Sequence, residues 1–201
     1  MKWAISNSLA AAVLVSMPCI CLAQEFSADV IYLPVPAVKG ARAAPPPGVQ
    51  AKLYVKKGQL RLEAEGVTHQ ILISDDANHT TVALSPMQKS YQELGDRPAE
   101  YFRVADAENA CPEWQRAVGK KFGCERVGND EVAGRSTVKY EGHTSTKGAD
   151  YIWVDPRLMY VIKWHAGDTE AELRNIKEGL QAADLFEVPQ DYGPMRPKRR
   201  R

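Results

Sequence analysis

Two hairpins are the clearest structures that the pattern of apolar and polar residues predicts. The first turns at Lys57-Gly58 and pairs residues 51–56 with residues 59–65. In this register the aliphatic side chains of both segments share one face, and a shift of one residue would scatter them. The other face is polar and places Lys52 opposite Glu63.

The second hairpin pairs residues 149–154 with residues 159–164 across the turn 155–158, which begins with Asp and Pro. If Val154 pairs with Met159, one face collects the large apolar residues Tyr151, Trp153, Tyr160, Ile162 and Trp164. Because the other face is also partly apolar, both sides of this hairpin must be covered. We predict these five residues as a ligand-binding surface; the alternative is that they are ordinary core beneath a helix.

The remaining strands are predicted to be short. They cover residues 26–33, 70–74, 81–84, 90–94 and 136–141. Turn signals at 75–78, 85–86, 128–129 and 133–134 separate them at the spacing of an antiparallel meander.

One helix is predicted to begin at Pro112, where proline suits the first helical position. A straight helix reaching residue 122 would hold Cys111 and Cys124 roughly 19 Å apart. A disulfide tolerates about 7 Å between Cα atoms. A bridge therefore requires the helix to stop near Val118, with Gly119 as its cap.

The N-terminal residues 1–23 are predicted to be a cleaved secretory signal. Lys2 precedes an apolar run over 9–20, and small residues at Cys21 and Ala23 suit cleavage after Ala23. The run is shorter than the ~20 residues that a membrane-spanning helix needs. Acylation of Cys19 or Cys21 is the alternative that we consider less fitting.

Export leaves one pair of cysteines, and a disulfide between Cys111 and Cys124 is its simplest explanation. Two free buried thiols are the alternative. Residues 24–193 are expected to form one domain, with a Pro/Ala-rich loop at 37–48.

Charge is divided unevenly along the chain. Five of the last six residues are basic, and they lie in a predicted disordered tail at 194–201. The exported residues before position 196 carry 20 basic and 25 acidic side chains. An acidic body does not suit nucleic acid as a partner. The tail is expected to be solvated; contact with anionic lipid or an acidic protein through residues 196–201 is the alternative.

The sequence contains no recognisable catalytic arrangement. Its four histidines are scattered, and common hydrolase, metalloprotease and phosphate-loop motifs are absent. The polar loop 75–79 collects oxygen and nitrogen ligands for which a metal is conceivable, but an ordinary polar hairpin loop has the same composition and is the interpretation that we favour. Glu63 and Glu65 share a strand face, but Lys52 opposite Glu63 favours a structural role. We therefore predict no catalytic residue, metal or cofactor, and a protein that is not an enzyme.

Several segments together resemble exported bacterial proteins of the LolA-like fold. They are residues 26–30, 51–63, 84–94, 124–135, 151–156 and 185–189. The resemblance implies a periplasmic, mainly β protein (α+β) built as an antiparallel unclosed half-barrel, with one or two short helices lidding the concave face. It also implies a strand over 170–178, although a capping box at 169–172 and helical spacing up to Leu180 locally favour a helix. A helical turn is then expected only at 182–186.

The resemblance also suggests a function. It implies a non-enzymatic envelope carrier of an apolar ligand, either a lipid acyl chain or a lipoprotein tail, with the aromatic face lining the lidded cavity. The alternative is an envelope protein-interaction or stress-sensor module whose cavity is filled.

Overall fold

The computed structural model describes residues 25–33, 48–64, 69–95, 101–118, 122–144, 147–167 and 169–195. The signal segment 1–23, most of the loop 37–48 and the basic residues 196–201 lie outside the described residues.

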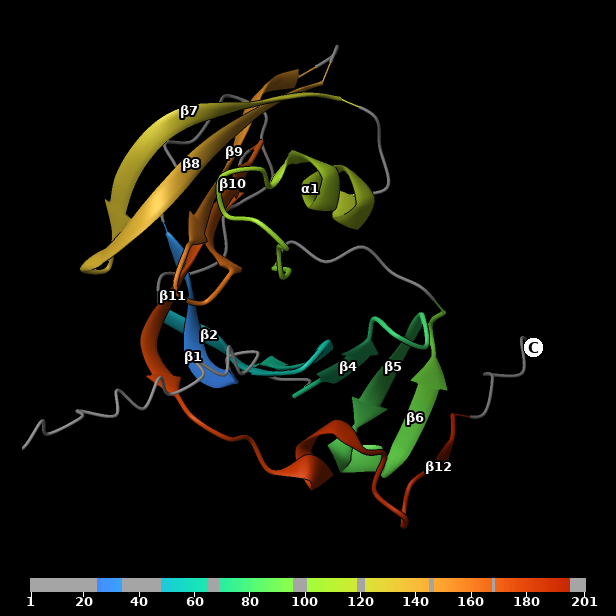
Figure 1. Cartoon of the computed structure of the whole chain (residues 1–201). Helices are drawn as coiled ribbons and strands as arrows, with labels where there is room; N and C mark the ends of the chain where they lie inside the picture. The colour runs from blue at the N-terminus through green and yellow to red at the C-terminus, as the bar shows by residue number, and fades with distance from the viewer. Residues whose placement is uncertain are drawn as a thin grey trace, which may run out of the picture.

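A single twelve-stranded sheet makes up most of the described chain (Figure 1). Its strands are β1 (Phe26–Leu33), β2 (Gly48–Lys56), β3 (Gln59–Ala64), β4 (Ile71–Asp75), β5 (Thr80–Ser85), β6 (Ser90–Glu93), β7 (Gly123–Val132), β8 (Arg135–Thr144), β9 (Lys147–Asp155), β10 (Tyr160–Ala166), β11 (Thr169–Glu178) and β12 (Gly193–Pro194). From edge to edge the order is β12-β6-β5-β4-β3-β2-β1-β11-β10-β9-β8-β7. Every neighbouring pair is antiparallel except β12 with β6.

The sheet does not close, because its edge strands β7 and β12 pair with different neighbours and not with each other. One short helix, α1 (Cys111–Val118), lies on the concave side of the curved strands β7–β10 (Figure 1). Two single 3₁₀ turns complete the elements, η1 (Pro86–Gln88) and η2 (Ala183–Phe186). The predicted fold class, an unclosed antiparallel half-barrel with a short helical lid, is therefore confirmed.

The sheet carries a core on each side. The face toward α1 and residues 101–110, here called the inner face, holds the larger cluster, which includes Leu53, Tyr140 and Trp164. The opposite, outer face carries a smaller cluster on β4 and β5, where η2 seats Phe186 against Ile73 and its neighbours.

The first hairpin has the predicted register. β2 and β3 pair from Lys56 with Gln59 to Ala51 with Ala64. Lys57 and Gly58 both have positive φ, 36° and 92°, as a two-residue hairpin turn requires.

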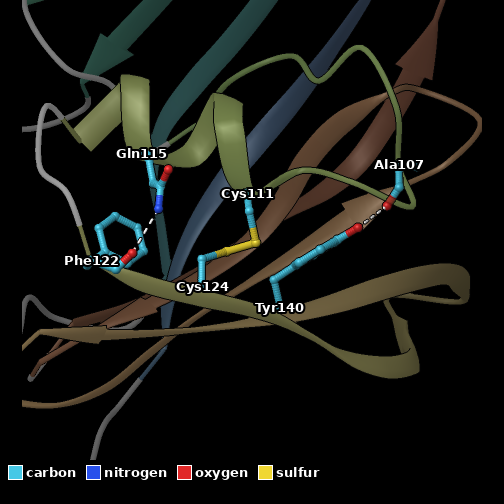
Figure 2. The surroundings of a disulfide bond; sticks show 6 residues. All are labelled: Ala107, Cys111, Gln115, Phe122, Cys124 and Tyr140. Atoms are coloured by element: carbon cyan, nitrogen blue, oxygen red, sulfur yellow. Dashed lines mark hydrogen bonds between the residues drawn. A yellow bond between two sulfur atoms is a disulfide. The ribbon is translucent and has the colours of Figure 1, made fainter.

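Helix α1 ends at Val118 as the bridge demands, and the disulfide is confirmed with 5.7 Å between the Cα atoms of Cys111 and Cys124. Figure 2 shows the bridge joining the start of α1 to β7, with Gln115 donating to the Phe122 carbonyl at 2.8 Å. Gly142 of β8 lies directly beneath the helix, since a Cβ there would stand 2.6 Å from the Trp114 ring. Any larger residue would force the Trp114 and Phe122 rings to shift.

Loss of the bridge is expected to destabilise the protein. It closes a loop of 13 residues, which in the chain-entropy model contributes about 3 kcal/mol. We expect Cys111→Ser/Cys124→Ser to lower the midpoint of thermal unfolding by several degrees, measured by circular dichroism. Reducing agent should have the same effect on the parent and none on the variant; equal midpoints in all three samples would contradict this.

The segment from Thr169 to Glu178 is a strand, as the resemblance implied, and the helix favoured by local spacing does not form. It pairs with both β1 and β10, so ladder hydrogen bonds on two sides outweigh the capping box. The turn predicted at Gly128-Asn129 is wrong. These residues lie inside β7, where the register with β8 shifts between Arg126 and Gly128 and forms a bulge.

Candidate functional site

The five predicted ligand-binding residues do not share a face, and a bulge in β10 is the reason. Asp155 pairs with Tyr160 and Val154 with Val161, but Trp153 then pairs with Lys163. The extra residue, Ile162, reverses the direction of every side chain that follows it.

The reversal separates the aromatic residues. Trp164 pairs with Ile152 and joins the inner face, whereas Tyr151 and Trp153 lie on the outer face beside His165 and Lys163. The sequence alone could not reveal this, because both alternations of the hairpin are apolar.

Beneath α1 the inner face is filled by side chains. Trp164 is 8% exposed and meets Tyr101 edge-on at 6.2 Å between ring centroids. The Tyr140 hydroxyl donates to the Ala107 carbonyl at 2.6 Å, as Figure 2 shows. The Trp114 ring of α1 packs edge-on against Phe122 at 5.0 Å.

Tyr160 and Ile162 belong to the same packed core. Tyr160 meets Phe26 edge-on at 5.1 Å, and its burial raises the pKa of its hydroxyl. Ile162 is fully buried. The lidded part of the inner face is therefore occupied by the protein's own aromatic and aliphatic side chains.

On the outer face, two lysines lie over the remaining aromatic pair. The Lys139 ammonium is 4.5 Å from the Tyr151 ring centroid and 5.0 Å from that of Trp153. Lys163 lies 4.7 Å from Trp153 on its other side. Cation–π contacts of this kind stabilise a sheet face by about 0.5–1 kcal/mol each when exposed.

A carboxylate completes this layer. The Trp153 indole donates to Asp130 at 2.8 Å, and this hydrogen bond lowers the pKa of the Asp130 carboxyl. Trp153 is only 7% exposed, so the lysines and neighbouring side chains cover the centre of this layer.

Further along the inner face, over β3 and β4, several apolar side chains remain partly accessible. Leu60, Leu62 and Leu72 are half-buried there and are called the leucine patch below. Leu62 pairs with Leu72, so the two side chains stand side by side. On the adjoining β2, Leu53 is 0% exposed. Burial therefore decreases across the inner face from β2 toward β4.

The histidines that the structure describes lie apart from one another. His143 contacts Glu141 at 3.0 Å, and His165 contacts Glu170 at 3.6 Å, a carboxylate that also pairs with Lys163 at 2.6 Å. Within the described ranges no cluster of three or more histidine, cysteine or carboxylate side chains is placed to hold a metal ion. No helix in this part of the chain is long and apolar enough to cross a membrane.

The fold and this surface define a class of protein, an unclosed half-barrel whose concave side is partly covered by a helix and carries half-buried leucines on β3 and β4. Solved structures share the architecture at low sequence identity. A conserved protein of Thermus thermophilus is 11% identical, covering 88% of this chain and 92% of its own, with a TM-score of 0.53. PNGF-II is 10% identical over 87% of this chain and 31% of its own, with a TM-score of 0.50.

MucB of Pseudomonas aeruginosa, solved in a complex with MucA, is 14% identical. The match covers 84% of this chain and 56% of that one, with a TM-score of 0.47. No family model and no curated protein matches the sequence. At these identities the likeness concerns the fold alone.

Proposed function

We propose that this protein is a non-enzymatic binding protein of the bacterial cell envelope and that its leucine patch contacts an apolar segment of the bound molecule. The observation that carries the proposal is the gradient of burial across the inner face. Leu60, Leu62 and Leu72 remain half-buried beside the fully buried Leu53 of the adjoining strand β2. Apolar surface left accessible on a concave face is typical of binding sites.

The ligand class that we propose is a lipid acyl chain or the acyl tail of a lipoprotein. An acyl chain is narrow and needs only a shallow apolar trough, which suits a site beside a filled core. The proposed envelope location rests on the predicted N-terminal signal and on the disulfide, which favours an oxidising compartment.

A second function is favoured by the filled space beneath α1. Trp114, Tyr140 and Trp164 occupy the volume that a deep lipid cavity would need. In this alternative the patch binds an apolar stretch of a protein, and the chain acts as an interaction or sensor module.

Binding of a fluorescent fatty acid to the purified protein tests the proposal. We expect saturable binding to the parent and at least a roughly tenfold weakening in Leu62→Glu, because a carboxylate among leucines cannot be buried without a partner. Leu180→Glu is the matched control, since Leu180 is 91% exposed and lies outside the patch. Thermal unfolding monitored on all three proteins separates lost binding from lost folding.

Two outcomes of these measurements would contradict the proposed function. Equal affinity in the parent and in folded Leu62→Glu would place the site elsewhere. A second experiment examines protein purified from its own envelope by native mass spectrometry and looks for released acyl species. If none is found, and the parent shows no saturable binding of the fatty acid, the carrier function is wrong and the interaction module remains.

A further inference from the structure

The outer face of the sheet contains a hollow of about 480 Å³ that belongs to neither the leucine patch nor the aromatic cluster. It runs along β1 between β2 and β11. Its polar lining consists of Ser27, Asp29, Lys52, Tyr54, Asn175 and Lys177. The hollow exists because short side chains on the central strand, such as Ser27, lie between the long side chains of the two flanking strands.

A bulge in β11 shapes one wall of this hollow. Ser27 pairs with Lys177 and Asp29 pairs with Arg174, so β11 contains one residue more than β1 between these points. Asn175 lies in the bulge with a φ of 52° and donates to the Asp29 carboxylate at 2.7 Å. Bulges often re-aim side chains next to binding sites.

Charge pairing around the hollow leaves two cations unmatched. Glutamates on the surrounding outer face are held by arginines. These pairs are Glu63 with Arg61, Glu172 with Arg174, and Glu178 with Arg135. The predicted pairing of Lys52 with Glu63 therefore exists only between backbones, since the carboxylate is taken by Arg61 at 2.7 Å.

Lys52 and Lys177 are both exposed, on opposite walls of the hollow. Among the described residues, neither has a carboxylate within the 4.0 Å of a salt bridge. The one carboxylate of the lining, Asp29, is held by the Asn175 amide.

We infer that this hollow binds a phosphate ester, with the phosphate between Lys52 and Lys177 and the organic group over Tyr54 and Ile176. Two lysines that line one hollow suit a phosphate better than a single carboxylate does, and the hydroxyls of Ser27 and Tyr54 add neutral donors. The volume exceeds what a bare phosphate needs and leaves room for a small organic substituent. The phosphate could belong to a free metabolite or to a lipid head group.

Titration of the isotope-labelled protein with glycerol 3-phosphate at low ionic strength tests the free ester. We expect saturable shifts of the backbone amide signals of residues 27–29, 52–54 and 175–177. Lys52→Gln and Lys177→Gln should each weaken binding by about tenfold, as expected for loss of one charge-assisted hydrogen bond. Lys57→Asn is the matched control, because it removes an exposed lysine from the adjacent turn and asparagine tolerates its positive φ.

A second arm replaces the ester by phosphatidylcholine vesicles with and without phosphatidylglycerol. Vesicle binding that falls in the Lys52→Gln/Lys177→Gln variant but not in Lys57→Asn, without any response to glycerol 3-phosphate, assigns the site to a lipid head group. Response to the soluble ester assigns it to a free phosphate ester. If the folded double variant equals the parent in both arms, or the parent responds in neither, the inference is wrong.

Discussion

Trp164→Ala is expected to lower the free energy of unfolding by about 3–5 kcal/mol, the usual cost of truncating a buried tryptophan. The indole is 8% exposed and packs edge-on against Tyr101. Its backbone neighbours across the sheet are Ile152 and Ala171, both buried, so the surrounding side chains have little freedom to collapse into the vacated space. Urea denaturation followed by circular dichroism measures the change.

Tyr151→Ala is the matched control on the same hairpin. Tyr151 lies on the outer face and is half-buried, so its truncation should cost clearly less. The comparison decides whether Trp164 is part of the packed core or lines an open cavity. A stable Trp164→Ala protein, with a loss below about 1 kcal/mol, would mean that Trp164 borders open space, contrary to the packing described above.

Asp155→Ala is expected to cost about 3–5 kcal/mol as well, because it breaks a buried ion pair on one side only. The carboxylate is 1% exposed and is bound by the Arg135 guanidinium. It also accepts from the backbone N–H groups of Arg157 at 2.8 Å and Leu158 at 3.2 Å, which holds the turn between β9 and β10. Truncation leaves the two turn donors without an acceptor and removes one of the two carboxylates, Asp155 and Glu178, that pair with the partly buried Arg135.

Asp75→Ala provides the comparison, because Asp75 ends β4 with the same local geometry. It accepts from the N–H groups of Ala77 at 3.0 Å and Asn78 at 3.1 Å, but it is only partly buried and has no arginine partner among the residues that the structure describes. Its truncation should cost about 1 kcal/mol, the value of ordinary hydrogen bonds at the surface. Equal losses for the two aspartates would show that the turn, and not the buried pair with Arg135, carries the stability.

The sequence alone predicted the features that depend on neighbouring residues. The β2–β3 register follows from aliphatic residues at every second position, and only one pairing keeps them together. The end of α1 near Val118 follows from the reach of a disulfide. In the hairpin a short-range geometric limit leaves one register, and in the helix it fixes the end once the bridge is assumed.

The tertiary structure decided what depends on contacts far apart in the chain. The segment Thr169–Glu178 has helical spacing, yet it is a strand because β1 and β10 supply ladder partners on both sides. Its strand assignment came from resemblance and not from local pattern.

The arrangement of the candidate site was likewise not predictable from the local sequence pattern. A β-bulge at Ile162 separates Trp164 from Trp153, and a hairpin that is apolar on both faces contains no periodic signal that marks such a bulge. Likewise, charge alternation placed Lys52 opposite Glu63, but only the fold shows that Arg61 takes the carboxylate. Alternation along a strand is set by the sequence, whereas the choice among partners within reach is made by the packed structure, where distance and burial determine which contact is the more stable.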